Sequence, residues 1–119
     1  MKIAGNIYGN VSSIDPSIET EYYHNVTSLS GKKYQAIRYT KTNYTVVFFN
    51  LLTPTYVNLR NYIKSHKGQA IVCGFPNDNG EFEEKEYFLT ITAETNKGFI
   101  NNKYLKNGLT VLFEAVNAD

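Results

Sequence analysis

The stretch YTVVFFNLLTPTYVNLRNYIKSHKGQAIVCGF, residues 44–75, decides the fold of this chain. It runs from a β-rich segment into one amphipathic helix and back to β patterning. We expect Thr53 to cap the helix, with Pro54 at its first position and Gly68 just beyond its end. The sequence therefore predicts a single α-helix, at about residues 54–67.

One face of this helix is apolar. At spacings of three and four residues, a single stripe carries Tyr56, Leu59, Tyr62, Ile63 and His66. A helix of about thirteen residues is marginally stable alone, so we expect the stripe to pack on a sheet.

The rest of the chain has the patterning of β-strands. Strands are predicted at residues 2–8, 32–39, 44–52, 69–75, 81–94, 99–105 and 109–116. Thr40–Asn43 is expected to form a four-residue hairpin loop, and residues 76–81 a tight turn. Both faces of the strand at 44–52 are apolar, which predicts a central strand packed between two layers.

Residues 11–31 are polar and weakly patterned, with a turn signal at Asp15-Pro16. They are predicted to be either an extended arm or a long loop, with a strand near Glu21–Asn25. The short connections elsewhere imply antiparallel pairing. The fold prediction is a mainly β (α+β) domain over residues 1–119: an antiparallel β-sandwich or barrel-like sheet with one flanking α-helix.

Composition excludes several functional classes. The chain has 119 residues, of which 12 are basic and 11 acidic, so its net charge is +1. This balance gives no reason to expect specific binding to nucleic acid or to an anionic membrane. No apolar run is long enough for a signal peptide or a membrane span, so we expect a cytoplasmic protein.

The residues that most often carry chemistry have structural explanations. Cys73, the single cysteine, lies in the apolar run QAIVCGF and is predicted to be a buried thiol. His66 suits the negative end of the helix dipole, and His24 lies in the weakly patterned segment. The chain has no Cys/His spacing of a zinc site.

The carboxylates follow no ligand or catalytic spacing. An acidic cluster lies around the turn after the helix: Asp78, Glu81, Glu83, Glu84 and Glu86. It lacks the spacing of a calcium loop and is better explained as a solvated hairpin tip. Nothing distinguishes Asp15 with Glu19, or Glu81 with Glu83, as a glycosidase pair.

An aromatic and basic group remains, made of Lys32, Lys33, Tyr34, Arg38 and Tyr39. It is a minor candidate for a nucleic-acid surface, which the balanced net charge disfavours. We therefore predict no catalytic, cofactor-binding or metal-binding residue, no cofactor, and no enzymatic activity.

From Lys33 onward the layout resembles small structural proteins of tailed-bacteriophage tails. The resemblance lies in the start MKIAGN, the segment RYTKTNYTVVFFNLL, the helix TPTYVNLRNYIKSHKG, and the segments GEFEEKEYFLTITAET and NGLTVLFEAV. Tail-tube and distal-tail proteins are β-sandwiches with one flanking helix, and extended hairpins or arms join their subunits into rings. The resemblance brings no catalytic residue, and residues 11–31 match nothing in the family's pattern.

The resemblance implies a non-enzymatic phage or prophage virion protein that self-associates, as a ring, during assembly of the tail tube, distal tail or tail-completion complex. Its partners would be copies of itself and other tail proteins, and it would lie in the host cytoplasm and then in the virion. The alternative is a small carbohydrate- or ligand-binding β-sandwich that uses exposed tyrosines. The absence of tryptophan weighs against that alternative.

Overall fold

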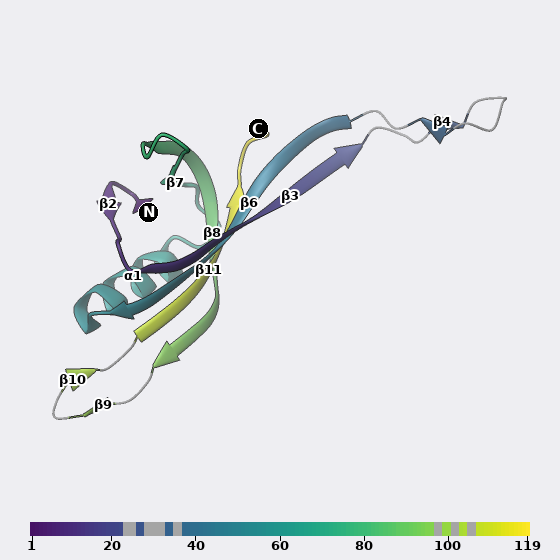
Figure 1. Ribbon diagram of the computed structural model, residues 1–119. Coiled ribbons are helices and arrows are strands. Elements are labelled where there is room, and N and C mark those ends of the chain that lie inside the picture. Colours follow the sequence, from purple (N-terminus) through teal and green to yellow (C-terminus); the bar gives the residue numbers. More distant parts are fainter. Residues whose placement is uncertain (23–25, 28–32, 35–36, 97–98, 101–102, 105–106) are drawn as a thin grey trace.

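The computed structural model describes residues 1–22, 26–27, 33–34, 37–96, 99–100, 103–104 and 107–119, with side chains over residues 1–21, 39–95 and 108–119. This part of the chain is mainly antiparallel β, with one helix on the inner side of the main sheet (Figure 1). The predicted fold class is confirmed, and the sheet is not closed into a barrel.

The main sheet has seven strands in the order β2-β1-β7-β8-β11-β6-β3. Its strands are β1 Lys2–Ile3, β2 Asn6–Ile7, β3 Val11–Tyr22, β6 Ile37–Leu51, β7 Ile71–Pro76, β8 Phe82–Asn96 and β11 Asn107–Ala115. Two short ladders pair β4 Val26–Thr27 with β5 Lys33–Tyr34, and β9 Phe99–Ile100 with β10 Lys103–Tyr104. Every pairing is antiparallel, as the short connections predict.

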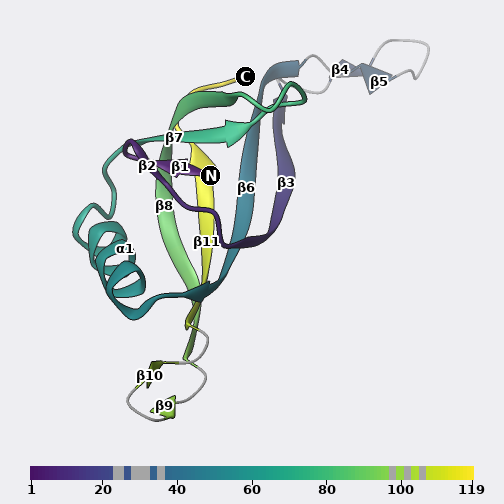
Figure 2. The same cartoon turned by 60° about the vertical axis from the view of Figure 1, so that its left-hand side comes forward.

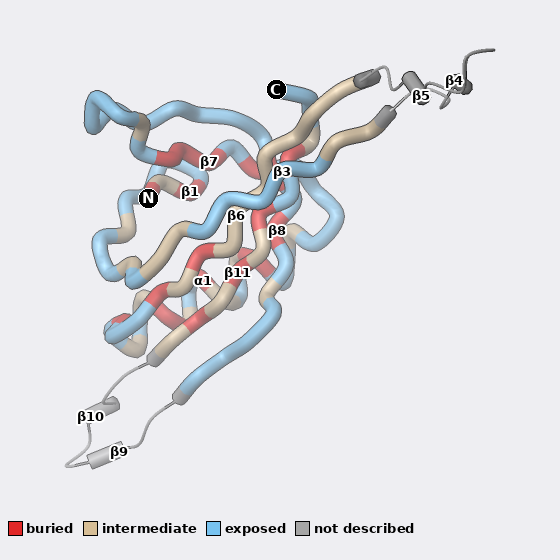
Figure 3. The backbone as a smooth tube through the Cα atoms, turned by 45° about the vertical axis from the view of Figure 1, so that its right-hand side comes forward, coloured by how far each residue is buried: buried red, intermediate tan, exposed pale blue. Residues whose placement is uncertain are grey.

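The sheet curls until strands that are not neighbours touch. Phe75 on β7 stacks on Tyr44 on β6, with ring centroids 4.1 Å apart, although β8 and β11 lie between these strands in the sheet. Tyr87 and Phe113 meet Phe75 edge-on at 5.3 Å. The inner face thereby encloses an aromatic and aliphatic core (Figures 2 and 3).

The helix α1 spans Thr53–Ser65 and buries Tyr56, Leu59 and Ile63 in that core. Its predicted position and apolar stripe are confirmed, with Tyr62 half-buried against the core. The predicted cap is wrong: Leu52 occupies the N-cap position, without a side-chain bond, and Thr53 is already helical.

The largest difference between the predicted and the observed strands concerns β3 and β6. Residues 11–22 form a 12-residue strand where a loop was one of two alternatives, and the turn expected at Asp15-Pro16 is absent. The hairpin loop expected at Thr40–Asn43 is also wrong, because these residues lie inside the 15-residue strand β6 and pair with Ser17–Thr20. An edge strand tolerates Pro16, since its outer side needs no amide hydrogen.

The first ten residues also differ from the prediction. Instead of one strand over residues 2–8, β1 and β2 form a tight hairpin through Ala4 and Gly5. Both turn residues have positive φ, 48° and 85°, as a type I′ turn requires. The pattern hid this turn because alanine seldom adopts that conformation.

The remaining strands lie close to their predicted positions. Strands β7, β8 and β11 match the predicted strands at 69–75, 81–94 and 109–116 within two residues at each end. The predicted strand at 99–105 is instead two short strands, β9 and β10, with residues 101–102 and 105 outside the described part. β6 is not central as predicted: it lies between β11 and the edge strand β3, and in the described part of the chain no second layer covers its outer face, where Phe49 is 43% exposed.

Gly74 of β7 lets an ion pair cross the outer face of the sheet. Lys2 Nζ lies 3.0 Å from Glu84 Oε1, on the two strands that flank β7. A Cβ atom at Gly74 would lie 3.2 Å from the Cβ atoms of both Lys2 and Phe82. Only a residue without a side chain allows this close crossing.

We expect Gly74→Val to lower the free energy of unfolding by about 1–3 kcal/mol, because β1 must move away from β7. Urea denaturation measures the change. The control is Gly9→Ala, which has no heavy atom within 4 Å of the new Cβ and no positive φ. It should change stability by no more than about 0.5 kcal/mol. Equal effects of the two substitutions would contradict this account.

Burial also predicts a loss of stability at alkaline pH. Burial raises the pKa of the Cys73 thiol from 9.0 to about 12 and, with smaller contributions from Tyr44 and other neighbours, raises the pKa of Tyr87 from 10.0 to about 12. The native state keeps these protons while the unfolded chain releases them. The stabilisation is therefore complete below pH 9 and is lost as the pH rises towards 12.

From pH 9 to 10, the stability of the wild-type protein should fall by about 1 kcal/mol because of Cys73, since the unfolded thiol is half titrated at pH 9. Cys73→Val removes this titration, so over the same interval its stability should fall only by the roughly 0.4 kcal/mol that Tyr87 contributes as it begins to titrate. Urea denaturation at pH 8, 9 and 10 makes the comparison. Parallel curves for the two proteins would refute the assignment to Cys73.

Candidate interaction surfaces

The pairing of β3 with β6 continues beyond the core as a two-stranded ribbon, here called the arm: residues 17–22 and 37–43 (Figure 1). None of its described side chains is buried (Figure 3). Its cross-strand contacts are polar: the Tyr39 hydroxyl donates to Glu21, and the Asn43 side-chain amide donates to Glu19 at 3.3 Å. Ile18 is the apolar exception, at 71% exposure.

The base of the arm is held from the opposite side by the last residues of the chain. The pairing of β11 with β6 ends at Phe113 and Tyr44, and the Ala115 amide then donates to Asn43 Oδ1 at 2.8 Å. Asp119 accepts from the Thr42 amide at 3.2 Å and from its hydroxyl at 2.7 Å, and donates its own amide to Thr40 O at 2.8 Å. These contacts provide hydrogen-bond partners for backbone groups of β6 beyond the point where its pairing with β11 ends.

The same contacts show which way the backbone groups of β3 point. Thr40 and Thr42 direct their backbone groups towards Asp119, away from β3. In an antiparallel ladder, two directly opposed residues either both point their backbone groups towards each other or both point them away from each other. Ile18 and Thr20, which oppose Thr42 and Thr40, therefore direct their N–H and C=O groups to the outer edge of the sheet, as Pro16 does. That edge pairs with no described strand.

The outer face of the sheet carries exposed apolar side chains. Val72, Phe49 and Phe88 are 46%, 43% and 37% exposed on three different strands of this face. Val72 and Phe88 each lie between two buried neighbours that point to the core, and Phe49 follows the buried Phe48. In the part of the chain that the structure describes, no element covers this face.

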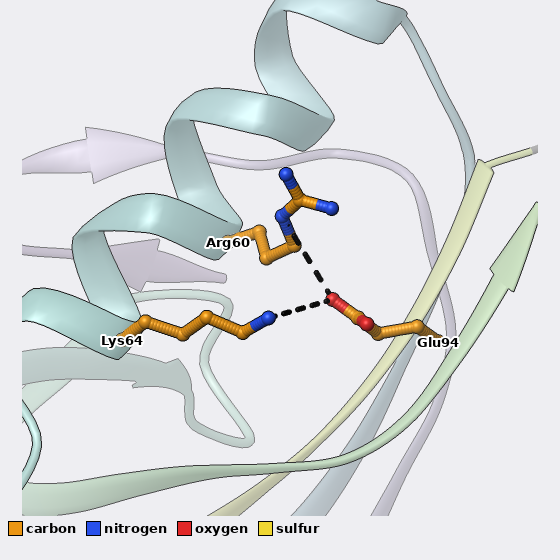
Figure 4. A network of polar contacts seen from close by, with 3 residues as sticks. All are labelled: Arg60, Lys64 and Glu94. Carbon is orange, nitrogen blue, oxygen red and sulfur yellow. Dashed lines mark ion pairs between the residues drawn. The ribbon is translucent and has the colours of Figure 1, made fainter.

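The solvent side of α1 and the nearby end of β8 form a charged surface. Arg60 Nε and Lys64 Nζ lie 3.9 and 3.7 Å from Glu94 Oε1 (Figure 4). Lys67, two residues beyond the end of the helix, is exposed. Together, Arg60, Lys64 and Lys67 are here called the basic helix face; it has three cations and one carboxylate partner among the described residues.

The predicted acidic cluster lies at the other end of β8, in the turn and strand of residues 77–86, here called the acidic hairpin. The turn is closed by bonds between Asn77 and Glu81, and Gly80 has a φ of 79°. All five acidic side chains are exposed, and Glu84 pairs with Lys2. No three His, Cys, Asp or Glu side chains of the described residues are arranged to hold a metal ion.

The other residues considered from sequence have structural positions. Cys73 is fully buried, with its Sγ 3.6 Å from Ile71 O, as predicted. His66 ends the helix: its Nδ1 lies 2.8 Å from Tyr62 O, and its ring stacks on that of Tyr62. Because a carbonyl only accepts, this contact requires a hydrogen on Nδ1.

Several predicted candidates are not brought together. Asp15 and Glu19 are exposed on β3 and pair with Thr45 and Lys41, with no acidic partner across the ladder. Glu81 and Glu83 belong to the acidic hairpin. His24, Lys32 and the side chains of Lys33, Tyr34 and Arg38 lie outside the described residues, so the aromatic and basic group is represented only by Tyr39.

The described surface offers small hollows. One of about 170 Å³ lies between α1 and β8, lined by Ile63, Lys64, Lys67 and Leu89–Ile91. One of about 320 Å³ lies beside the acidic hairpin and the C-terminal segment. Ligand pockets usually measure about 300–1,000 Å³ and are mostly apolar, whereas the larger hollow is lined mainly by charged and small residues. The described tyrosine side chains are buried or half-buried, so they form no exposed platform for a sugar.

Two residues of this region were missed by sequence reasoning. Asn43 was assigned to a loop, and Asp119 carried no signal, because an aspartate carboxylate outside any predicted element is ordinarily solvated. Their roles depend on contacts between residues 72 and 77 positions apart. An asparagine inside a β-rich run was the one available hint, since asparagine is uncommon in strands.

The helix found in the described part of the chain is too short to cross a bilayer. Comparison with protein-family models and with curated proteins finds no match. The function of the chain is therefore inferred from its fold and from the surfaces described above.

Proposed function

We propose that this chain is a non-enzymatic structural subunit that self-associates into a ring through its arm, as in the tails of tailed bacteriophages or prophages. The observation that carries the proposal is the arm, a ribbon that continues beyond the core and whose outer edge, at Ile18 and Thr20, pairs with no described strand. The resemblance in layout to tail-tube and distal-tail proteins supports the tail assignment.

The shape of the chain supports an assembly role. Its radius of gyration is 18.6 Å and it measures 73 × 28 × 27 Å. A compact domain of this length has a radius of gyration of about 13.5 Å. A projecting ribbon adds surface without adding a core, and an isolated two-stranded ribbon is marginally stable in water. Contact with another copy would supply the missing burial.

The outer edge of β3 has the features of a strand-addition site. The strand is 12 residues long, and Ile18 and Thr20 direct their backbone groups outward. Such an edge pairs readily with another chain unless charge, a bulge or a cover blocks it. Pro16 interrupts the row of donors at one position, which leaves Ile18 and Thr20 as the outward donors of the arm.

A closed ring needs two different complementary surfaces on each subunit. The arm edge supplies one of them by β-addition. The uncovered outer face, with Phe49, Phe88 and Val72 exposed, is suited to be buried against the neighbouring copy that the arm reaches.

We expect Ile18→Pro to prevent ring formation while the monomer stays folded. The new proline has the same orientation as the native Pro16, so it removes an outward donor and leaves the pairing with β6 intact. Light scattering coupled to size exclusion should find a closed oligomer for the wild-type protein and a monomer for the variant. Circular dichroism checks the fold.

The matched control is Ile18→Thr, which keeps the outward N–H and removes most of the apolar side chain. It should still assemble, and this separates edge pairing from side-chain burial. A wild-type protein that stays monomeric at high concentration, or an Ile18→Pro variant that assembles normally, would refute the role of the arm.

The tail assignment has an independent test in the genome. We expect genes for tape-measure, portal or terminase proteins beside the gene for this chain. A location in every sequenced host among unrelated metabolic genes would argue against a phage origin, whatever the oligomeric state.

A further inference from the structure

We propose that the basic helix face of one copy binds the acidic hairpin of a second copy, so that copies stack head to tail. The inference rests on the proposed function in one respect, since it makes the stacked units rings. It concerns surfaces different from the arm and has its own test.

The two surfaces carry opposite charge. Between residues 51 and 70 the chain has three basic residues, Arg60, Lys64 and Lys67, and no acidic one. Between residues 77 and 86 it has five acidic residues and one lysine, a net charge of −4. Five of the 11 acidic residues of the chain are therefore gathered in ten positions.

Contacts within the subunit leave much of this charge unpaired. Glu94 is the one described carboxylate in ion-pair distance of the basic helix face, and Lys2 neutralises only Glu84 in the acidic hairpin. No ion pair between described residues joins the helix to the hairpin. Lys64 keeps 58% of its side chain exposed, and Glu84 46%.

The surfaces border different parts of β8: the acidic hairpin extends to Glu86, and the basic helix face lies beside Leu89–Ile91 and Glu94. Glu84 and Leu89 are five residues apart on this strand, about 17 Å along its path at the usual rise per residue. Charges so far apart are screened from each other at physiological salt, where the Debye length is about 8 Å. The attraction is therefore available to a second copy.

The position of the surfaces determines the kind of assembly. A contact between two different surfaces forms a ring when its rotation closes and an open repeat when it does not, and an open repeat of rings is a stack. A single exposed ion pair changes an association constant by about fivefold at most, so monomers would stack weakly. A ring presents every copy of the contact at once, and the repeated contacts then act together.

The test uses two charge-reversed variants of the full chain. Glu81→Lys/Glu83→Lys/Glu86→Lys reverses the hairpin and spares Glu84, which pairs with Lys2. Lys64→Glu/Lys67→Glu reverses the helix face. Each variant alone should fail to stack in sedimentation velocity, because its two surfaces then repel. An equimolar mixture should stack again, because the native helix face of one variant meets the native hairpin of the other, and the two reversed surfaces also carry opposite charge.

The ionic strength distinguishes the stacking contact from the contacts that form the ring. Raising the ionic strength from about 0.1 M to about 1 M shortens the Debye length from about 10 Å to about 3 Å. The wild-type protein should form stacks at the lower salt and discrete rings at the higher. Discrete rings at both concentrations would overturn the stacking proposal and leave the ring intact. Monomers at high salt that associate at low salt would support stacking and refute the ring.

Two further outcomes are decisive. If both variants lose association and their mixture does not recover it, the helix face binds some other acidic partner and the proposal is wrong. If Lys64→Glu unfolds the helix because it faces Glu94, Lys67→Glu alone serves, since Lys67 has no described carboxylate partner. It should weaken stacking severalfold without changing the melting curve, and an unchanged sedimentation profile would contradict the proposal.

Discussion

The contact on which the fold depends is the stack of Phe75 on Tyr44. It joins β7 to β6 across two intervening strands, and so converts an open antiparallel sheet into an enclosure. Phe113 and Tyr87 complete the aromatic cluster from the strands between. The helix then needs to fill only the remaining side, with Tyr56, Leu59 and Ile63. In this way the described core is built from one seven-stranded sheet and one helix, and the single cysteine of the chain leaves no internal disulfide to support it.

Tyr44 is also the residue at which the core ends. On one side of it, β6 lies between β3 and β11 and buries Val46 and Phe48. On the other side, β11 no longer pairs with β6. Asn43 accepts from the Ala115 amide, Asp119 accepts from the Thr42 amide, and only β3 continues alongside β6. The arm is thus a consequence of strand length: β6 has 15 residues, and the core covers about half of them.

The sequence predicted the elements whose burial alternates. The helix, β7, the middle of β8 around Tyr87 and Leu89, and β11 have one face in the core, so their apolar residues recur with the period of the element. The arm has no buried face, and its polar residues looked like a loop around Thr40–Asn43 and a turn at Asp15-Pro16. Its pairing is specified by the partner strand, residue by residue, and a single strand read alone contains no such information.

For the same reason, the sequence indicated only one of the surfaces proposed for assembly. The acidic cluster was evident from composition, and its explanation as a solvated hairpin tip holds for the isolated subunit. Its position relative to the basic helix face depends on how α1 packs along β8, and the sequence alone does not show this. Backbone pairing at an edge is little affected by salt, whereas attraction between exposed charges is strongly screened. A subunit with both would close its rings through the arm and stack them through charge, so the two steps of assembly would respond to different conditions.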